Sequence, residues 1–131
     1  MKTLLSLLIC LLLIPSFAAA QEASSEAAGL NVEKAVAATA VEDREPVGEA
    51  TEFDASVGKV YCWTKILAET TPTTLKHVWF ADDQQVFEII LDIKYPSTRT
   101  WSVKTIRAGS WRVEITDDAG NVLSAVGFTV K

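Results

Sequence analysis

The segment WRVEIT, residues 111–116, decides the fold class because its apolar and polar side chains alternate strictly. In an extended strand this spacing puts Trp111, Val113 and Ile115 on one face and the polar residues between them on the other. The segment FEIILDIK, residues 87–94, is also apolar at every second position. Strands with one dry and one wet face are typical of antiparallel sheets packed as a sandwich.

Working outward from this segment, turn-forming residues divide the C-terminal part of the chain into short strands. We expect six strands, at about residues 59–67, 74–80, 85–94, 98–106, 111–116 and 122–130. Asp118-Ala119-Gly120 has the composition of a hairpin turn. No long helical pattern separates the strands, which excludes a parallel α/β fold. The sequence therefore predicts an all-β, small antiparallel immunoglobulin-like sandwich over residues 53–131.

The first twenty residues have the pattern of a secretory signal peptide. Lys2 precedes an apolar run over residues 4–14, and small residues follow at Ala18-Ala19-Ala20. The run is short for a permanent membrane anchor. We expect cleavage after Ala20, a periplasmic or secreted protein, and no transmembrane span after cleavage.

Residues 21–52 are predicted to form a linker. They are rich in Ala and Glu, and they hold almost no large apolar side chains. Two interpretations stay open for this stretch: one short helix near residues 32–40, favoured by weak helical spacing, or a flexible spacer. Pro46 and Gly48 would end any helix there.

Charge and cysteine content narrow the function. The chain has a formal net charge of −5, which argues against nucleic acid as a partner. Of its two cysteines, Cys10 lies inside the expected signal peptide, so Cys62 would remain alone and no intramolecular disulfide would form. We expect Cys62 to be buried as a small apolar side chain.

A symmetric hairpin around residues 69–70 would pair Cys62 with His77 on neighbouring strands. In this register Cys62, His77 and Trp79 would point inward, and Tyr61 and Trp63 would be partly exposed. A Cys beside a His is the arrangement of thiol enzymes, but the sequence offers no third group or oxyanion loop to complete it. We therefore expect no enzyme activity, and we predict no metal site and no cofactor.

The alternative to catalysis is recognition, because aromatic and cationic side chains on a sheet bind sugars, peptides and proteins. The candidate binding residues are Tyr61, Trp63, Arg99, Trp101, Lys104 and Arg112. Trp63 is the best exposed candidate. Trp79 and Trp111 instead occupy the apolar positions of the alternation in their strands, so we expect both in the core. A surface ladder remains open, in which Arg99 and Lys104 pair with acidic residues across strands.

Three short motifs follow one another: H-x-W at residues 77–79, R-T-x-S-x-K at residues 99–104 and G-x-W-x-V at residues 109–113. Together they resemble the bacterial family called domain of unknown function 2914, from about residue 57 to the C-terminus. The resemblance implies an exported or membrane-attached β domain and transfers no catalytic residue. We interpret five residues as structural: Cys62, His77, Trp79, Ser102 and Trp111.

These observations favour an exported β-sandwich module that binds a glycan or a protein partner in the cell envelope. The main alternative is a structural or assembly accessory of the envelope with no small ligand. A Cys–His hydrolase is the third hypothesis, and reactivity of the Cys62 thiol would separate it from the other two.

Overall fold

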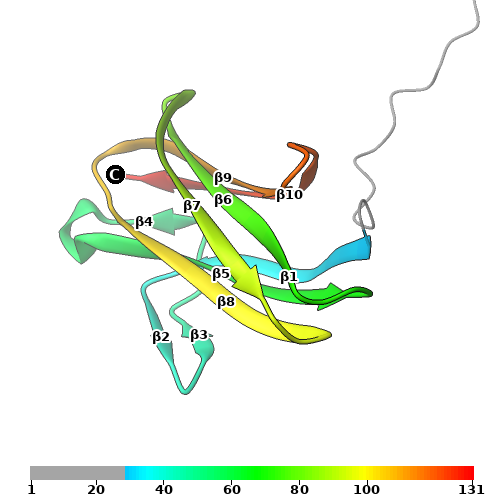
Figure 1. Cartoon of the computed structure of the whole chain (residues 1–131). Helices are drawn as coiled ribbons and strands as arrows, with labels where there is room; N and C mark the ends of the chain where they lie inside the picture. Colours follow the sequence, from blue (N-terminus) through cyan, green and yellow to red (C-terminus); the bar gives the residue numbers. More distant parts are fainter. Residues whose placement is uncertain (1–28) are drawn as a thin grey trace, which may run out of the picture.

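The computed structural model describes residues 29–131, which fold into two packed sheets and a small projecting hairpin (Figure 1). The three-stranded sheet has the order β1-β5-β8, and the five-stranded sheet has the order β4-β10-β9-β6-β7. The strands are β1 (Leu30–Ala38), β2 (Ala40–Glu42), β3 (Glu45–Val47), β4 (Glu52–Phe53), β5 (Lys59–Ala68), β6 (Thr73–Ala81), β7 (Gln84–Ile93), β8 (Ser97–Thr105), β9 (Gly109–Asp117) and β10 (Val122–Val130). A short 3₁₀ turn, η2 (Ala55–Val57), precedes β5.

The predicted antiparallel sandwich is confirmed, and each of the six expected strands is present. All pairings are antiparallel except the two-residue contact of β4 with β10. The alternation in β9 also has the expected result, because Trp111, Val113 and Ile115 are at most 2% exposed. Within residues 29–131 no helix is long and apolar enough to cross a membrane. The expected signal peptide, residues 1–20, lies outside the described residues.

An aromatic cluster fills one end of the space between the sheets. Trp111 stacks on Phe128 with ring centres 6.0 Å apart, and Trp79 meets both rings edge-on at 6.3 Å. Phe53 closes the cluster with an edge-on contact to Phe128 at 5.6 Å. The core assignment of Trp79 and Trp111 is therefore confirmed.

The prediction of a linker or short helix before residue 53 is wrong for the residues that the structure describes. β1 pairs along nearly all of β5, and β2 and β3 form a hairpin whose turn holds Asp43 and Arg44 at positive φ. Ala37 and Ala38 are buried at 2% and 0% exposure. Small, weakly apolar side chains suffice here because β5 supplies the hydrogen-bonding partner, and this tertiary pairing overrides the low strand propensity of alanine.

The predicted hairpin between the first two C-terminal strands is also wrong. β5 pairs with β1 and β8 in one sheet, whereas β6 pairs with β7 and β9 in the other. The inward faces were nevertheless assigned correctly, since Cys62, His77 and Trp79 are all 0% exposed. Alternation determines which face of a strand is buried, but it does not determine which strand lies beside it.

Candidate binding face

A buried polar network links the two sheets across the core. The Ser102 hydroxyl on β8 lies 2.7 Å from His77 Nδ1 and 3.0 Å from Trp79 Nε1, both on β6. On the other side of the imidazole, Thr64 Oγ1 on β5 lies 3.3 Å from His77 Nε2 and donates to the Thr100 carbonyl at 2.8 Å. The H-x-W motif and the serine of R-T-x-S-x-K are therefore parts of one structural unit.

With a neutral imidazole, only one arrangement of protons satisfies every contact in this network. The Thr64 hydroxyl gives its proton to the Thr100 carbonyl, so it accepts from His77 Nε2–H. His77 Nδ1 is then the acceptor for the Ser102 hydroxyl, whose oxygen accepts from the Trp79 indole. The imidazole is neutral in this arrangement, and burial lowers the pKa of His77 to about 4.

Cys62 lies in the same interior and is closed off from solvent. Its side chain is 0% exposed, and burial raises the pKa of the thiol to about 12. A neutral, enclosed thiol is a poor nucleophile because the thiolate is the reactive form. Cys62 and His77 belong to opposite sheets, so the strand pairing from which the hydrolase hypothesis started is wrong.

The outer face of the three-stranded sheet gathers four of the six predicted binding residues. These side chains lie on the side of the sheet opposite to Cys62 and Ser102, which face the core. The four residues are Tyr61, Trp63, Arg99 and Trp101. Trp63 lies directly opposite Trp101, with Val36 of β1 on its other side. We call this surface, with the β2–β3 hairpin beside it, the outer face.

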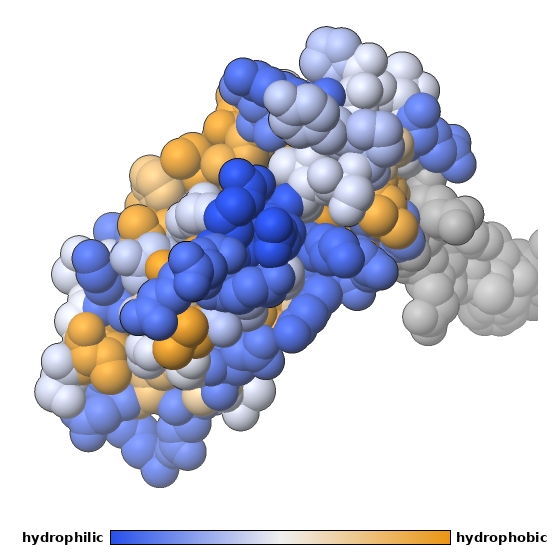
Figure 2. Space-filling view, turned by 90° about the horizontal axis from the view of Figure 1, so that it is seen from below, coloured by the Kyte–Doolittle hydropathy of each residue, from blue (hydrophilic) through white to orange (hydrophobic). Residues whose placement is uncertain are grey.

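Three cations form a row across the outer face. Lys34 of β1 lies opposite Lys65 of β5, which lies opposite Arg99 of β8. Each has one carboxylate partner: Lys34 with Glu49 at 2.9 Å, Lys65 with Glu33 at 3.1 Å and Arg99 with Glu45 at 2.6 Å. Viewed from the side of the hairpin, hydrophilic side chains gather across the middle of the molecule with hydrophobic ones on either side (Figure 2).

The prediction that Trp63 is exposed is wrong, because its side chain is 2% exposed. The β2–β3 hairpin packs over this part of the sheet, and the indole Nε1 donates to the Arg44 carbonyl at 3.0 Å. The Lys34 ammonium lies 5.9 Å from the centre of the indole ring. Trp63 therefore anchors the hairpin, while Tyr61 and Trp101 beside it are partly exposed.

The hairpin and the sheet enclose a cavity of about 480 Å³. Its lining residues are Lys34, Arg44, Glu45, Trp63, Lys65, Ser97 and Arg99. Four of these side chains are cations and one is a carboxylate, on a chain whose net charge is −5. The lining of the cavity thus carries more cations than carboxylates, with Glu49 and Glu33 paired to Lys34 and Lys65 beside it, and the volume is typical of small-molecule sites.

The other two predicted binding residues lie away from this cavity. Lys104 has the inward parity of Ser102, and its ammonium lies 6.0 Å from the centre of the Phe87 ring. This contact falls at the open side of the sandwich, where β7 and β8 are the edge strands of their sheets. Lys104 therefore covers the half-buried apolar side chain of Phe87.

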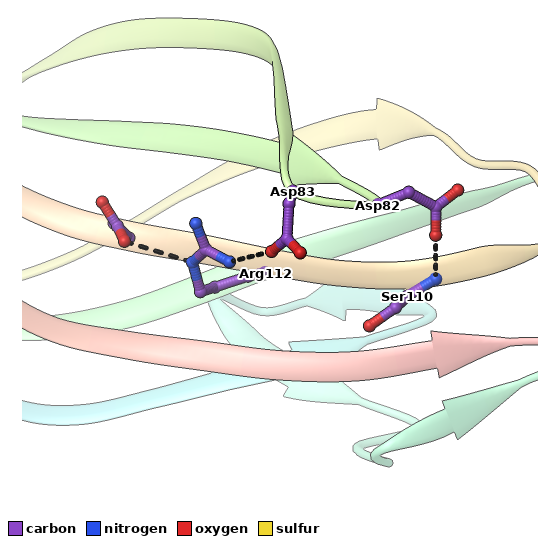
Figure 3. Close-up of polar contacts among 5 residues, drawn as sticks. Asp82, Asp83, Ser110 and Arg112 are labelled. Carbon is purple, nitrogen blue, oxygen red and sulfur yellow. Dashed lines mark hydrogen bonds and ion pairs between the residues drawn. The ribbon is translucent and has the colours of Figure 1, made fainter.

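Arg112 is occupied by contacts on the outer side of the five-stranded sheet. Its Nη1 lies 3.1 Å from Asp83 Oδ1, and its Nε lies 3.1 Å from Glu114 Oε2 (Figure 3). The guanidinium carbon also lies 4.3 Å from the centre of the Phe80 ring. Arg112 thus pairs within β9 and with the β6–β7 turn. The surface ladder expected for Arg99 and Lys104 with Glu88, Asp92 or Glu114 is wrong, because Arg99 pairs with Glu45 and Lys104 covers Phe87.

Sequence reasoning missed Lys34, Arg44 and Lys65, which complete the cavity around Arg99. Lys65 alternates with Tyr61 and Trp63, so its parity already placed it on the same face as these aromatics. Lys34 and Arg44 lie in the stretch that was predicted to be a linker, and no signal there indicated a face. Among residues 29–131 no group of three or more His, Cys, Asp or Glu side chains is placed to hold a metal ion.

The two sheets and the cavity define an all-β sandwich domain with a row of ion-paired cations on its outer face. The family model described as "Protein of unknown function (DUF2914)" matches residues 72–130, from the start of β6 to the end of β10. The family expected from the motifs is therefore confirmed over this stretch, which contains His77, Trp79, Ser102 and Arg99. No curated protein matches the chain.

Proposed function

We propose that the protein is a non-catalytic binding module of the cell envelope, and that it binds a glycan or protein partner with its outer face. The single observation that carries this proposal is the cavity beside the β2–β3 hairpin, where Lys34, Lys65 and Arg99 stand in one row. The location rests on the signal-peptide pattern of residues 1–20. The burial of Cys62 and His77 supports a role without catalysis.

The ion pairs of the outer face favour a second candidate function. Each cation of the row already has a carboxylate partner within the chain. A face that satisfies its own charges suits a structural or assembly accessory, which would need no small ligand.

A comparative pull-down from envelope extracts tests the proposal. The wild-type protein is compared with a Lys65→Glu, Arg99→Glu double variant, in which the middle and one end of the row are reversed. Arg112→Glu is the matched control, because it reverses a cation on the other sheet. We expect the wild type and the control to capture the same partner and the double variant to lose it. Equal capture by all three would show that the outer face is not the binding surface.

A further inference from the structure

The row of cations places like charges opposite one another on neighbouring strands, and the fold offsets each of them with a single exposed carboxylate. Neighbouring strands lie about 4.8 Å apart, so Lys34, Lys65 and Arg99 span roughly 10 Å in a line across the sheet. Like charges directly opposite each other on neighbouring strands are destabilising. Neutral polar side chains would solvate an outer sheet face without this repulsion, so a role in binding an anion accounts for three cations in line.

The carboxylates that now face the row can be replaced by a ligand. The side chains of Glu49, Glu33 and Glu45 are 41%, 46% and 57% exposed. Ion pairs between such solvated groups contribute about 0–1 kcal/mol each. An incoming anion therefore displaces these carboxylates at little energetic cost, and they return to water.

Arg44 adds a fourth cation at the mouth of the cavity. It sits in the turn of the β2–β3 hairpin, and its side chain is exposed. Within the part of the chain that the structure describes, no ion pair involves Arg44. The hairpin holds this charge above the row because the Arg44 carbonyl accepts the hydrogen bond of Trp63, whose ring is fixed in the sheet.

The row of cations runs across the strands, and this direction indicates which kind of anionic ligand fits it. A peptide that binds a sheet as an added strand needs a free strand edge and runs parallel to the strands. The row instead crosses β1, β5 and β8 at right angles to the strands, so a ligand along it does not add to the free edge of β1 or of β8. A ligand that follows the row is held by side chains alone, at anionic groups repeated along its length.

Trp101 supplies the second feature of the ligand. It lies two residues from Arg99 on the same face of β8, and it is only partly buried. An exposed indole face packs against the apolar face of a sugar ring, while a neighbouring arginine pairs with a carboxylate. An aromatic ring beside a row of cations matches a polymer that carries carboxylates on sugar rings.

We propose that the outer face binds an acidic polysaccharide, with its carboxylates on Lys34, Lys65, Arg99 and Arg44 and a sugar ring on Trp101. This inference rests on the proposed function and specifies the chemical class of the partner. The cavity of about 480 Å³ holds a short segment of the polymer next to the hairpin.

Isothermal titration with polygalacturonate tests this inference on the purified full chain. The comparison ligands are a neutral glucan and polyglutamate, which carries similar charges on a peptide backbone. We expect binding of polygalacturonate that weakens with salt, no binding of the glucan, and binding of polyglutamate at least about tenfold weaker. The Lys65→Gln, Arg99→Gln double variant should weaken polygalacturonate binding at least about tenfold, and Trp101→Ala should weaken it as well.

A Lys104→Gln, Arg112→Gln double variant is the matched control, because it removes the same charge from outside the cavity and should bind normally. Equal affinity for polyglutamate would overturn the saccharide class and favour an acidic protein. No binding of polygalacturonate would overturn the inference, while the envelope pull-down would still decide the proposed function independently. Unchanged affinity of the Lys65→Gln, Arg99→Gln variant would show that the ligand binds elsewhere.

Discussion

Ser102→Ala is the perturbation that most sharply tests the buried network. The Ser102 hydroxyl accepts from the Trp79 indole at 3.0 Å and donates to His77 Nδ1 at 2.7 Å. Alanine removes both contacts while keeping the Cβ atom, so it changes the packing volume little. The indole N–H and the imidazole nitrogen are then left without partners on two side chains that are 0% exposed.

The expected loss of stability follows from those two orphaned groups. A buried polar group that loses its partner costs about 1–3 kcal/mol, so the two together cost about 2–6 kcal/mol. Small domains have unfolding free energies of about 5–15 kcal/mol. Ser102→Ala should therefore remove a large part of the stability of this domain.

Urea denaturation followed by tryptophan fluorescence measures the loss directly. Ser110→Ala is the matched control, because Ser110 is exposed and this change should alter the unfolding free energy by no more than about 0.5 kcal/mol. A second variant, Ser102→Ala with His77→Leu, should recover part of the loss because the imidazole no longer seeks a partner. A cost below about 1 kcal/mol for Ser102→Ala would refute the network as drawn.

Three further predictions follow from buried groups. The pKa of His77 in the folded state, about 4, lies below its unfolded value of 6.5, so acidification favours the unfolded state. The free energy of unfolding should therefore fall by about 2 kcal/mol between pH 7.5 and 5. Urea titrations of the His77→Gln variant should not show this pH-dependent loss. Cys62 should react with iodoacetamide on the order of a thousandfold more slowly in the folded protein than in urea, because burial raises the pKa of its thiol from 9.0 to about 12. Peptide mass spectrometry measures the rate of labelling. Rapid labelling of the folded form would contradict the burial of Cys62. The Asp117 carboxylate accepts hydrogen bonds from Ala119 and Asn121 across the β9–β10 turn. Asp117→Ala should therefore lower the thermal midpoint and reduce the free energy of unfolding by about 1–3 kcal/mol. Asp118→Ala is the control, because Asp118 is exposed and its loss should leave the thermal midpoint unchanged.

The sequence was sufficient to predict the sandwich because the strands after residue 58 carry strong alternation. In β9, Trp111 and Val113 had to face the core, and they do. The alternation of apolar and polar residues is weak before residue 53, where Ala37 and Ala38 are small enough to suit a linker as well as a strand. The sequence also could not predict which strands pair. Cys62 would be buried among apolar side chains whichever strand lies beside β5, so its burial does not identify that strand.

The binding face was only partly predictable for a related reason. Arg99 and Trp101 are two residues apart on one strand, so their shared face follows from parity alone. Their partners Lys34 and Arg44 come from segments more than fifty residues earlier in the chain, and only the tertiary pairing brings them together. Trp63 was expected to be partly exposed because nothing in the sequence revealed that a hairpin would fold over it.

The most direct test of the central claim is site-specific photocrosslinking in intact cells. A photoreactive residue replaces Ser97, which lines the cavity, or Ala125, which is exposed on the other sheet. If the outer face is the binding surface, illumination yields a discrete adduct from position 97 and none from position 125. An adduct from position 125 alone, or from neither position, would contradict the account.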